Sequence, residues 1–228
     1  EYLGTDHQEY RYDLEEMLAV LPKVIYHLES YDAALVRSAV ANYFLARLAG
    51  GQIQEVLSGE GADELFLGYE YLMDLSPSEV ERESESLLQS LHHTALQRGD
   101  RMSQAFGIRP YTPFLDREVV RFARSIPAAI KLKAGKQEKW ILREAFQGFL
   151  PESILYRTKK KFSAGAGSSQ VLAQFAEDSI SEEVWNRERI TETGRPIASK
   201  EELLYYRLFK EYYPERSAEL ILGHTEHI

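Results

Sequence analysis

The chain has 228 residues, 44% of them hydrophobic and 28% charged, a composition typical of a soluble globular protein long enough to bury a sizeable core. Its 36 Asp and Glu against 27 Lys and Arg give a net charge of -9, which argues against a nucleic-acid-binding surface and favours work on small molecules. The absence of cysteine excludes disulfides, thiolate zinc sites and a cysteine nucleophile, and no apolar run approaches the ~20 residues that a membrane span requires. We therefore expect a cytoplasmic protein that binds neither membranes nor nucleic acid.

The first fifty residues predict one strand and two helices. Residues 2–12 mix aromatic and polar side chains in rough alternation, which indicates a strand with one buried face. Asp13 and Glu16 have the spacing of a capping box, so we expect a helix that begins there, with a break near Pro22. A second amphipathic helix is expected over residues 33–49.

Residues 53–69 predict a strand, a turn and a helix, around which we expect the rest of the chain to be organised. The apolar run at 53–57 is typical of a buried strand, which we expect to pair in parallel with the strand at 2–12. The turn Ser58-Gly59-Glu60-Gly61 follows, and Asp63 then lies in the first turn of a helix, where an acid complements the helix dipole. In an open α/β sheet such a turn lies where ligands bind, although the spacing alone suits an ordinary helix start equally well.

The remainder of the chain predicts mainly helices. Apolar residues recur at helical spacing over 78–98, 116–125, 139–149 and 201–213. A basic run that starts at Lys159 enters the glycine-containing segment 163–169, which we expect to be a loop able to close over a substrate. The next two residues, Lys160 and Lys161, suit a solvated basic edge.

Several stretches resemble one enzyme family. Residues 58–69 read Ser-Gly-Glu-Gly-Ala-Asp-Glu-Leu-Phe-Leu-Gly-Tyr, which resembles the signature of the synthetase domain of glutamine-dependent asparagine synthetase. Residues 100–103, 113–116 and 157–159 resemble further landmarks of that family.

The chain also departs from the family at two places. Leu67 stands where the family has glycine, a change that we expect to affect helix packing more than chemistry. The segment around Tyr111 lacks a family arginine, for which Arg98 could compensate in space.

The resemblance implies a helix-rich α/β fold that contains part of an adenine-nucleotide alpha-hydrolase-like parallel sheet. Residues 1–70 would form the C-terminal part of the nucleotide-binding core, and residues 71–228 a helical subdomain that carries the Lys159 loop. The implied reaction is that of an ATP-dependent ligase, which converts aspartate through aspartyl-AMP to asparagine, with ammonia released from glutamine. ATP and Mg²⁺ are the implied cofactors.

The motif positions imply a role for each candidate residue. Such chemistry needs cations at the triphosphate, carboxylate oxygens for Mg²⁺, and a base for the incoming ammonia. By position, Lys159 resembles the catalytic cation, Asp63 the ligand of Mg²⁺ and pyrophosphate, and Glu60 the base. The other candidate contacts of the nucleotide are Ser58, Gly59, Gly61 and Arg98.

Two parts of the family have no counterpart in this sequence. These are the pyrophosphate loop Ser-Gly-Gly-x-Asp-Ser and the glutaminase half with its N-terminal cysteine. Because the first residue is not Met, we expect the chain to be a piece of a longer protein whose upstream portions are its partners, and to be inactive alone.

Two alternative functions stay open. A beta-lactam-synthetase-like ring-closing ligase shares the adenylation step, but that group resembles a version of the turn with Tyr where Glu60 stands. A non-catalytic interaction or regulatory protein derived from the fold is the second alternative. The sequence also leaves open the oligomeric state, a homodimer among the options, and whether the acceptor is free aspartate or a larger acid.

Overall fold

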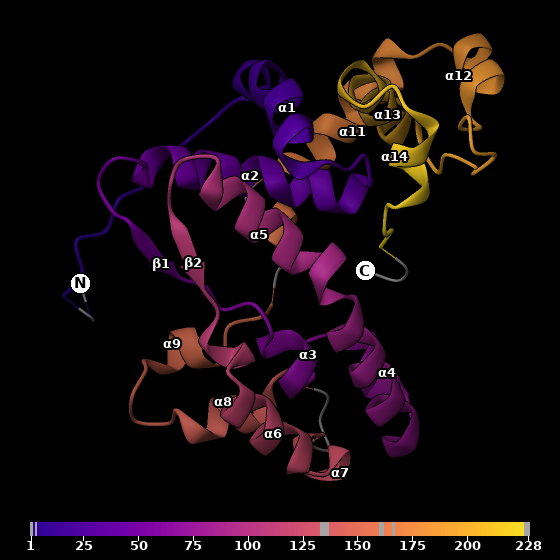
Figure 1. Cartoon of the computed structure of the whole chain (residues 1–228). Coiled ribbons are helices and arrows are strands. Elements are labelled where there is room, and N and C mark those ends of the chain that lie inside the picture. Colours follow the sequence, from indigo (N-terminus) through magenta and orange to yellow (C-terminus); the bar gives the residue numbers. More distant parts are fainter. Residues whose placement is uncertain (1, 3, 133–136, 160–161, 166, 226–228) are drawn as a thin grey trace. The chain divides into compact units, whose positions relative to one another are not determined.

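The computed structural model describes the whole chain except residues 1, 3, 133–136, 160–161, 166 and 226–228 (Figure 1). It divides into two compact units. Unit 1 comprises Glu1–Gln54, Arg98–Arg109 and Phe162–Ile228, and unit 2 comprises Glu55–Gln97 and Pro110–Lys161. Each unit is therefore assembled from segments that are distant in the sequence. None of the described helices is long and apolar enough to cross a bilayer.

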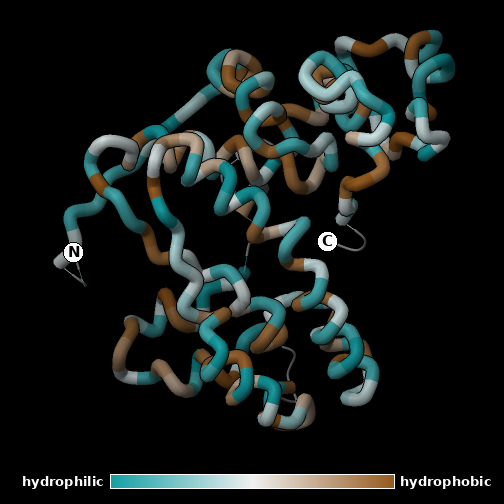
Figure 2. Tube along the Cα trace, in the orientation of Figure 1, coloured by the Kyte–Doolittle hydropathy of each residue, from teal (hydrophilic) through white to brown (hydrophobic). Residues whose placement is uncertain are grey.

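Unit 1 is built from helices around one hydrophobic core. The helices α1 (Leu14–Leu28) and α2 (Ala33–Ala49) pack together, and α11 (Ser168–Ser179) and α13 (Lys200–Tyr212) pack against both. Their apolar faces recur as brown segments along the helices in Figure 2. The remaining helices with residues in this unit are α5 (Ala95–Gln104, from Arg98 onward), α10 (Phe162–Gly165), α12 (Glu182–Glu188) and α14 (Arg216–Leu220).

The two N-terminal helices begin where the sequence predicts. Asp13 and Glu16 form the capping box of α1, and α2 has the predicted bounds. The predicted break near Pro22 is wrong, because α1 continues through Pro22 to Leu28. Proline removes one helical hydrogen bond at a cost of about 3 kcal/mol, and the buried face of α1 in the core of unit 1 offsets that cost.

The predicted strand at residues 2–12 is wrong over its described residues, which form a turn and irregular backbone. Tyr10 and Tyr12 stack instead on Phe44 of α2, with ring centroids 5.5 Å and 4.4 Å apart. The alternating aromatic pattern therefore reflects packing on a helix, which requires no partner strand.

The two described strands are β1 (Glu55–Leu57) and β2 (Arg109–Tyr111), which pair with each other. The backbone bonds Arg109 N to Gln54 O (2.9 Å) and Ser58 N to Tyr111 O (2.7 Å) advance in the same direction along both strands, so the pair is parallel. The strand predicted at 53–57 is confirmed, but both its predicted partner and its burial are wrong. The Leu57 side chain is 76% exposed, because this strand lies in a sheet of only two described strands.

In unit 2 the short helix α3 (Ala62–Phe66) lies among the other helices. Leu65 and Phe66 of α3 pack with Ala123 of α6 (Arg117–Ser125) and with the partly buried residues of α8 (Trp140–Ala145). A second cluster joins the segment after α3 to α4 (Pro77–Ser90) and α7 (Ala128–Lys131). The unit is completed by α9 (Glu152–Leu155) and by 3₁₀ turns at Glu70–Asp74, Leu91–His93 and Pro113–Leu115.

The helical half differs from prediction in detail. The helix predicted at 78–98 is divided into α4, a 3₁₀ turn and α5, and the helix predicted at 139–149 is shorter. The predicted loop at 163–169 is wrong, since α10 and the start of α11 occupy most of it, with Gly167 at φ 81° preceding α11. Glycine can adopt that left-handed conformation and so separates two helices without a long loop. Lys160 and Lys161 lie outside the described residues.

Candidate functional site

The turn before α3 carries four of the predicted site residues, Ser58, Gly59, Glu60 and Gly61. Ser58 follows β1, and its Oγ lies 3.4 Å from the backbone N of Glu60 as a hydrogen-bond acceptor. Gly61 has φ 94°, and a Cβ at this position would lie 2.5 Å from Cδ2 of Leu115. Only glycine fits both the conformation and the close approach. The turn therefore has a fixed path, with Glu60 half-buried on it.

Asp63 binds two lysines. Nζ of Lys159 donates a hydrogen bond to Oδ1 of Asp63 at 2.6 Å and another to the backbone O of Gly68. Nζ of Lys139 lies 3.1 Å from the same carboxylate oxygen. The three side chains are 26–28% exposed, so solvent reaches the cluster. The structure thus brings together Asp63 and Lys159, to which the family resemblance gives neighbouring roles at the phosphates.

Lys139 is a site residue that the sequence analysis missed. The available signal was the string Lys-Trp-Ile-Leu-Arg at 139–143. Lys139 precedes α8 with φ 54°, a conformation that non-glycine residues rarely adopt, and its backbone N donates to the O of Leu67 at 3.1 Å. Such backbone strain persists only where the surroundings fix it, so the position of Lys139 is set by the segment after α3.

Leu67 and Gly68 have different roles in this segment. A Cβ built on Gly68 would lie 2.5 Å from Cγ of Asp63 and 2.6 Å from Cε of Lys139, so the cluster requires glycine there. Leu67 also has a left-handed backbone, at φ 59°, yet its side chain is 1% exposed in a hydrophobic cluster with Leu72. Leu67 therefore contributes packing at the cost of backbone strain.

Lys159 contacts the ring of Tyr69, and Tyr69 in turn binds Glu64. Nζ of Lys159 is 4.6 Å from the centre of the Tyr69 ring, and the Tyr69 hydroxyl donates to Oε1 of Glu64 at 2.5 Å. Glu64 is 3% exposed, and its Oε2 has no hydrogen-bond partner among the described residues. Burial raises the pKa of Glu64, and burial followed by the Glu64 carboxylate raises the pKa of Tyr69, which therefore stays protonated and donates.

Arg98 belongs to unit 1, whereas the Asp63 cluster belongs to unit 2. Nη1 of Arg98 donates to Oδ1 of Asn42 at 2.9 Å, and the guanidinium lies 5.8 Å from the centre of the Phe162 ring. The role of Arg98 at a nucleotide stays a prediction. Tyr111 lies in the segment that lacks the family arginine. Its hydroxyl donates a hydrogen bond to Oε1 of Glu55 at 3.0 Å.

The oxygen ligands that the site offers are compatible with Mg²⁺ bound together with a nucleotide. Over the described ranges of the chain, no three His, Asp or Glu side chains are grouped so that they could hold a metal ion. Mg²⁺ in nucleotide sites is commonly held by one or two carboxylates together with phosphate oxygens and water, so Asp63 fits as one such ligand. The two lysines beside it suit the phosphates that would supply the other ligands.

Comparison with known proteins points to one family. A family model described as asparagine synthase matches residues 1–82 and 73–227. The chain is 37% identical to asparagine synthetase (glutamine-hydrolyzing) 1 of Saccharomyces cerevisiae over 233 residues, and 35% identical to asparagine synthetase B (glutamine-hydrolyzing) of Escherichia coli over 222 residues. It is 32% identical over 231 residues to asparagine synthetase (glutamine-hydrolyzing) of Brassica oleracea. These alignments cover 95%, 95% and 96% of the chain but 40%, 40% and 39% of the relatives, so the chain spans about two fifths of their length.

Proposed function

The chain belongs to the asparagine synthase family, and we propose that it supplies part of the active site of an ATP-dependent ligase that makes asparagine from aspartate. In the proposed reaction the side-chain carboxylate of aspartate attacks the α-phosphorus of ATP, which gives aspartyl-AMP and releases pyrophosphate. Ammonia then attacks the acyl carbon and AMP leaves. The observation that carries the proposal is the convergence of Lys139 and Lys159 on Asp63 beside a glycine-containing turn.

The first step generates a strongly anionic leaving group. Two ammonium groups, each within 3.1 Å of one carboxylate oxygen, form a preorganised cationic site for pyrophosphate. In the absence of a nucleotide Asp63 pairs with both lysines but balances only one of their two charges, so the cluster keeps a formal charge of +1. Phosphate oxygens would take the place of Asp63 as partners of the lysines. Mg²⁺ held by Asp63 and the phosphates would add positive charge at the same position.

The second step needs a proton acceptor. As the carbon–nitrogen bond forms and the bond from carbon to the AMP oxygen breaks, the attacking nitrogen must lose a proton. We assign that proton to the carboxylate of Glu60, which is half-buried on the turn three residues before Asp63. The proposed first step thus uses Asp63 with Lys139 and Lys159, and the second uses Glu60, which lies on the same strand-turn-helix as Asp63.

Other portions of the same protein complete the proposal. The relatives are named glutamine-hydrolyzing, and we infer that a glutaminase portion supplies the ammonia and an upstream pyrophosphate loop supplies further phosphate contacts. On this account the chain alone is inactive. Glu60 argues against a ring-closing ligase of the beta-lactam type. The other alternative is a non-catalytic protein in which Asp63 and the two lysines form only a structural ion-pair cluster, and the experiment below separates it from the ligase.

The test uses the two half-reactions of the complete protein. Lys159→Ala should lose both ATP–pyrophosphate exchange and asparagine synthesis from added ammonia, because adenylate formation needs the cation. Glu60→Gln should retain exchange but lose synthesis by ~10² to 10⁴-fold, the usual loss for a general base. Lys23→Ala, at an exposed lysine of α1, is the matched control and should retain both activities.

Two outcomes would contradict the proposal. If the unmodified complete protein exchanges no pyrophosphate into ATP, the ligase function is wrong. If Glu60→Gln loses exchange as fully as Lys159→Ala, Glu60 organises the nucleotide or the metal, and its role as the base must be abandoned.

A further inference from the structure

Arg143 connects the two segments that carry the lysines of the site. It lies on α8, four residues after Lys139, and its Nε donates to the backbone O of Glu138 at 2.8 Å. Its Nη1 donates to the backbone O of Leu155 and, at 3.2 Å, to the backbone O of Arg157. One guanidinium therefore binds the residue before Lys139 and the residue two positions before Lys159.

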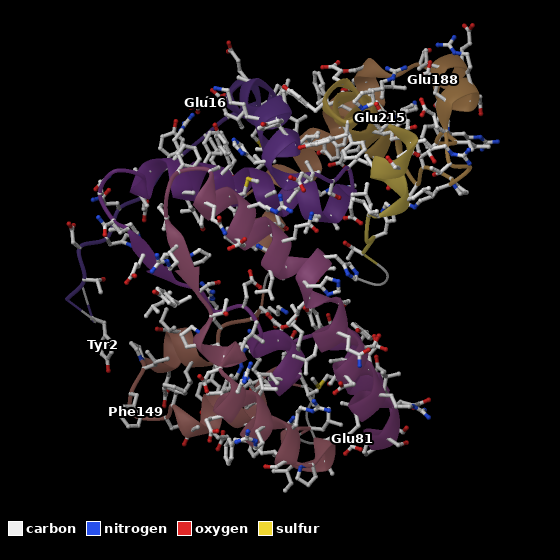
Figure 3. All side chains as sticks on the ribbon, viewed as in Figure 1. Tyr2, Glu16, Glu81, Phe149, Glu188 and Glu215 are labelled. Carbon is white, nitrogen blue, oxygen red and sulfur yellow. The ribbon has the colours of Figure 1, made fainter. Side chains whose placement is uncertain are left out.

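The chain between these segments has little packing of its own. Phe149, on the connection between α8 and α9, is 71% exposed (Figure 3), and Ile154 of α9 is 55% exposed. Leu155 is the buried apolar residue of α9. Because Phe149 and Ile154 are largely exposed, polar bonds have a large share in fixing the position of Lys159.

We propose that Arg143 is a positioning residue that fixes the separation of the Lys139 and Lys159 ammonium groups for pyrophosphate, an inference that rests on the proposed function. Its guanidinium is planar and presents several donors in a fixed geometry, so it reaches carbonyls of two segments at once. A lysine at this position has a compact point charge on a flexible stem and cannot reproduce that fork.

A second polar contact limits how far the segments separate without Arg143. Nε2 of Gln147, two residues after α8, donates to the Tyr156 hydroxyl at 2.7 Å and so also links the segment after α8 to the segment before Lys159. Loss of Arg143 should therefore loosen the spacing of the lysines without releasing the segment. A displacement of about 1 Å at a site of this kind costs on the order of 10²-fold in rate. We expect kcat/KM for pyrophosphate in the exchange reaction to fall about 10- to 100-fold here, through a higher KM for pyrophosphate.

The test compares Arg143→Lys with Arg121→Lys in the complete protein. Arg121 is exposed on α6 and pairs with Glu118, so its replacement controls for the same chemical change. In ATP–pyrophosphate exchange, Arg143→Lys should raise the KM for pyrophosphate at least 10-fold and leave the KM for aspartate unchanged, with the control at the unmodified values. A purely structural role would lower the amount of active protein and leave both KM values alone.

The outcomes separate this inference from the proposed function. If the unmodified protein exchanges pyrophosphate and Arg143→Lys has an unchanged KM for it, the positioning role is wrong. If the unmodified protein does not exchange pyrophosphate, the ligase function is wrong. The role of Arg143 is then tested by calorimetric titration with pyrophosphate, and equal affinity of the unmodified protein and the variant would overturn it. Should Arg143→Lys not fold, Arg143→Met, which retains an unbranched apolar stem, takes its place with the same criteria.

Discussion

Gly68→Ala should disable the phosphate site through steric overlap alone. The new Cβ would lie 2.5 Å from Cγ of Asp63 and 2.6 Å from Cε of Lys139, whereas ordinary van der Waals contact begins at 3.4 Å. The new Cβ would come still closer to Oδ1 of Asp63, the oxygen that both lysines contact. The Asp63 carboxylate must therefore move by at least about 1 Å, away from the position where both lysines bind it. Misplacement by 1 Å costs about 10²-fold in rate, or ~2.7 kcal/mol in the activation free energy.

The assay is ATP–pyrophosphate exchange by the complete protein, measured well below the thermal unfolding midpoint of each variant. Overpacking costs typically 1–3 kcal/mol in unfolding free energy, so calorimetry must confirm that Gly68→Ala is folded at the assay temperature. Gly99→Ala is the matched control, because a Cβ at that helical glycine of α5 would meet nothing within 4 Å. Exchange by folded Gly68→Ala at the unmodified rate would refute the reasoning, since Asp63 would then tolerate displacement.

Two further predictions concern the free energy of unfolding. Leu67→Gly removes a left-handed backbone strain of about 1–2 kcal/mol, but it also removes a buried side chain whose loss costs about 2–5 kcal/mol. The variant should therefore have a lower midpoint of thermal unfolding, and a higher midpoint would contradict the packing role of Leu67. Burial opposes the charge of Glu219, but bonds from Lys210, Tyr206 and Thr193 outweigh it and lower the pKa of this carboxyl below 4.5. The folded-state pKa is depressed, so this stabilisation is present above the unfolded pKa and is lost as pH falls through the folded one. Denaturant unfolding should show Glu219→Gln less stable by about 2 kcal/mol at pH 7, with the difference shrinking in acid, and a pH-independent difference would contradict this account.

Local features of the sequence were sufficient to predict much of the secondary structure. The caps and apolar periodicity of 14–28 and 33–49 specify α1 and α2, and Ser199 caps α13 close to the predicted start. These signals work because helical hydrogen bonds and caps join residues three or four positions apart. The strand predicted at 2–12 is wrong because alternating aromatic and polar residues indicate only that one face of the segment packs. In this segment the aromatic side chains pack on a helix.

The turn of the candidate site could also be predicted from the sequence. Two glycines and two polar residues after a short apolar run, followed by Asp63 in a helix start, are local signals, and the structure has β1, the turn and α3 in that order. The family resemblance identified Lys159 as a partner for the same chemistry. Whether these residues act as proposed is what the exchange experiments test.

The sequence by itself therefore determined the caps, the helices and the glycine turn, each of which depends on residues a few positions apart. Only the tertiary structure decided that β1 pairs with β2, that Lys139 joins Lys159 on Asp63, and that Glu64 is buried beneath Tyr69. Asp63 and Lys159 are 96 residues apart, and no local hydrogen bond or periodicity encodes a contact over that separation. Asp63 and Lys139 come together because α3, α6 and α8 bury their apolar faces together. The segment before Lys159 is joined to α8 by the hydrogen bonds of Arg143 to the backbone of Leu155 and Arg157, which also depend on tertiary structure.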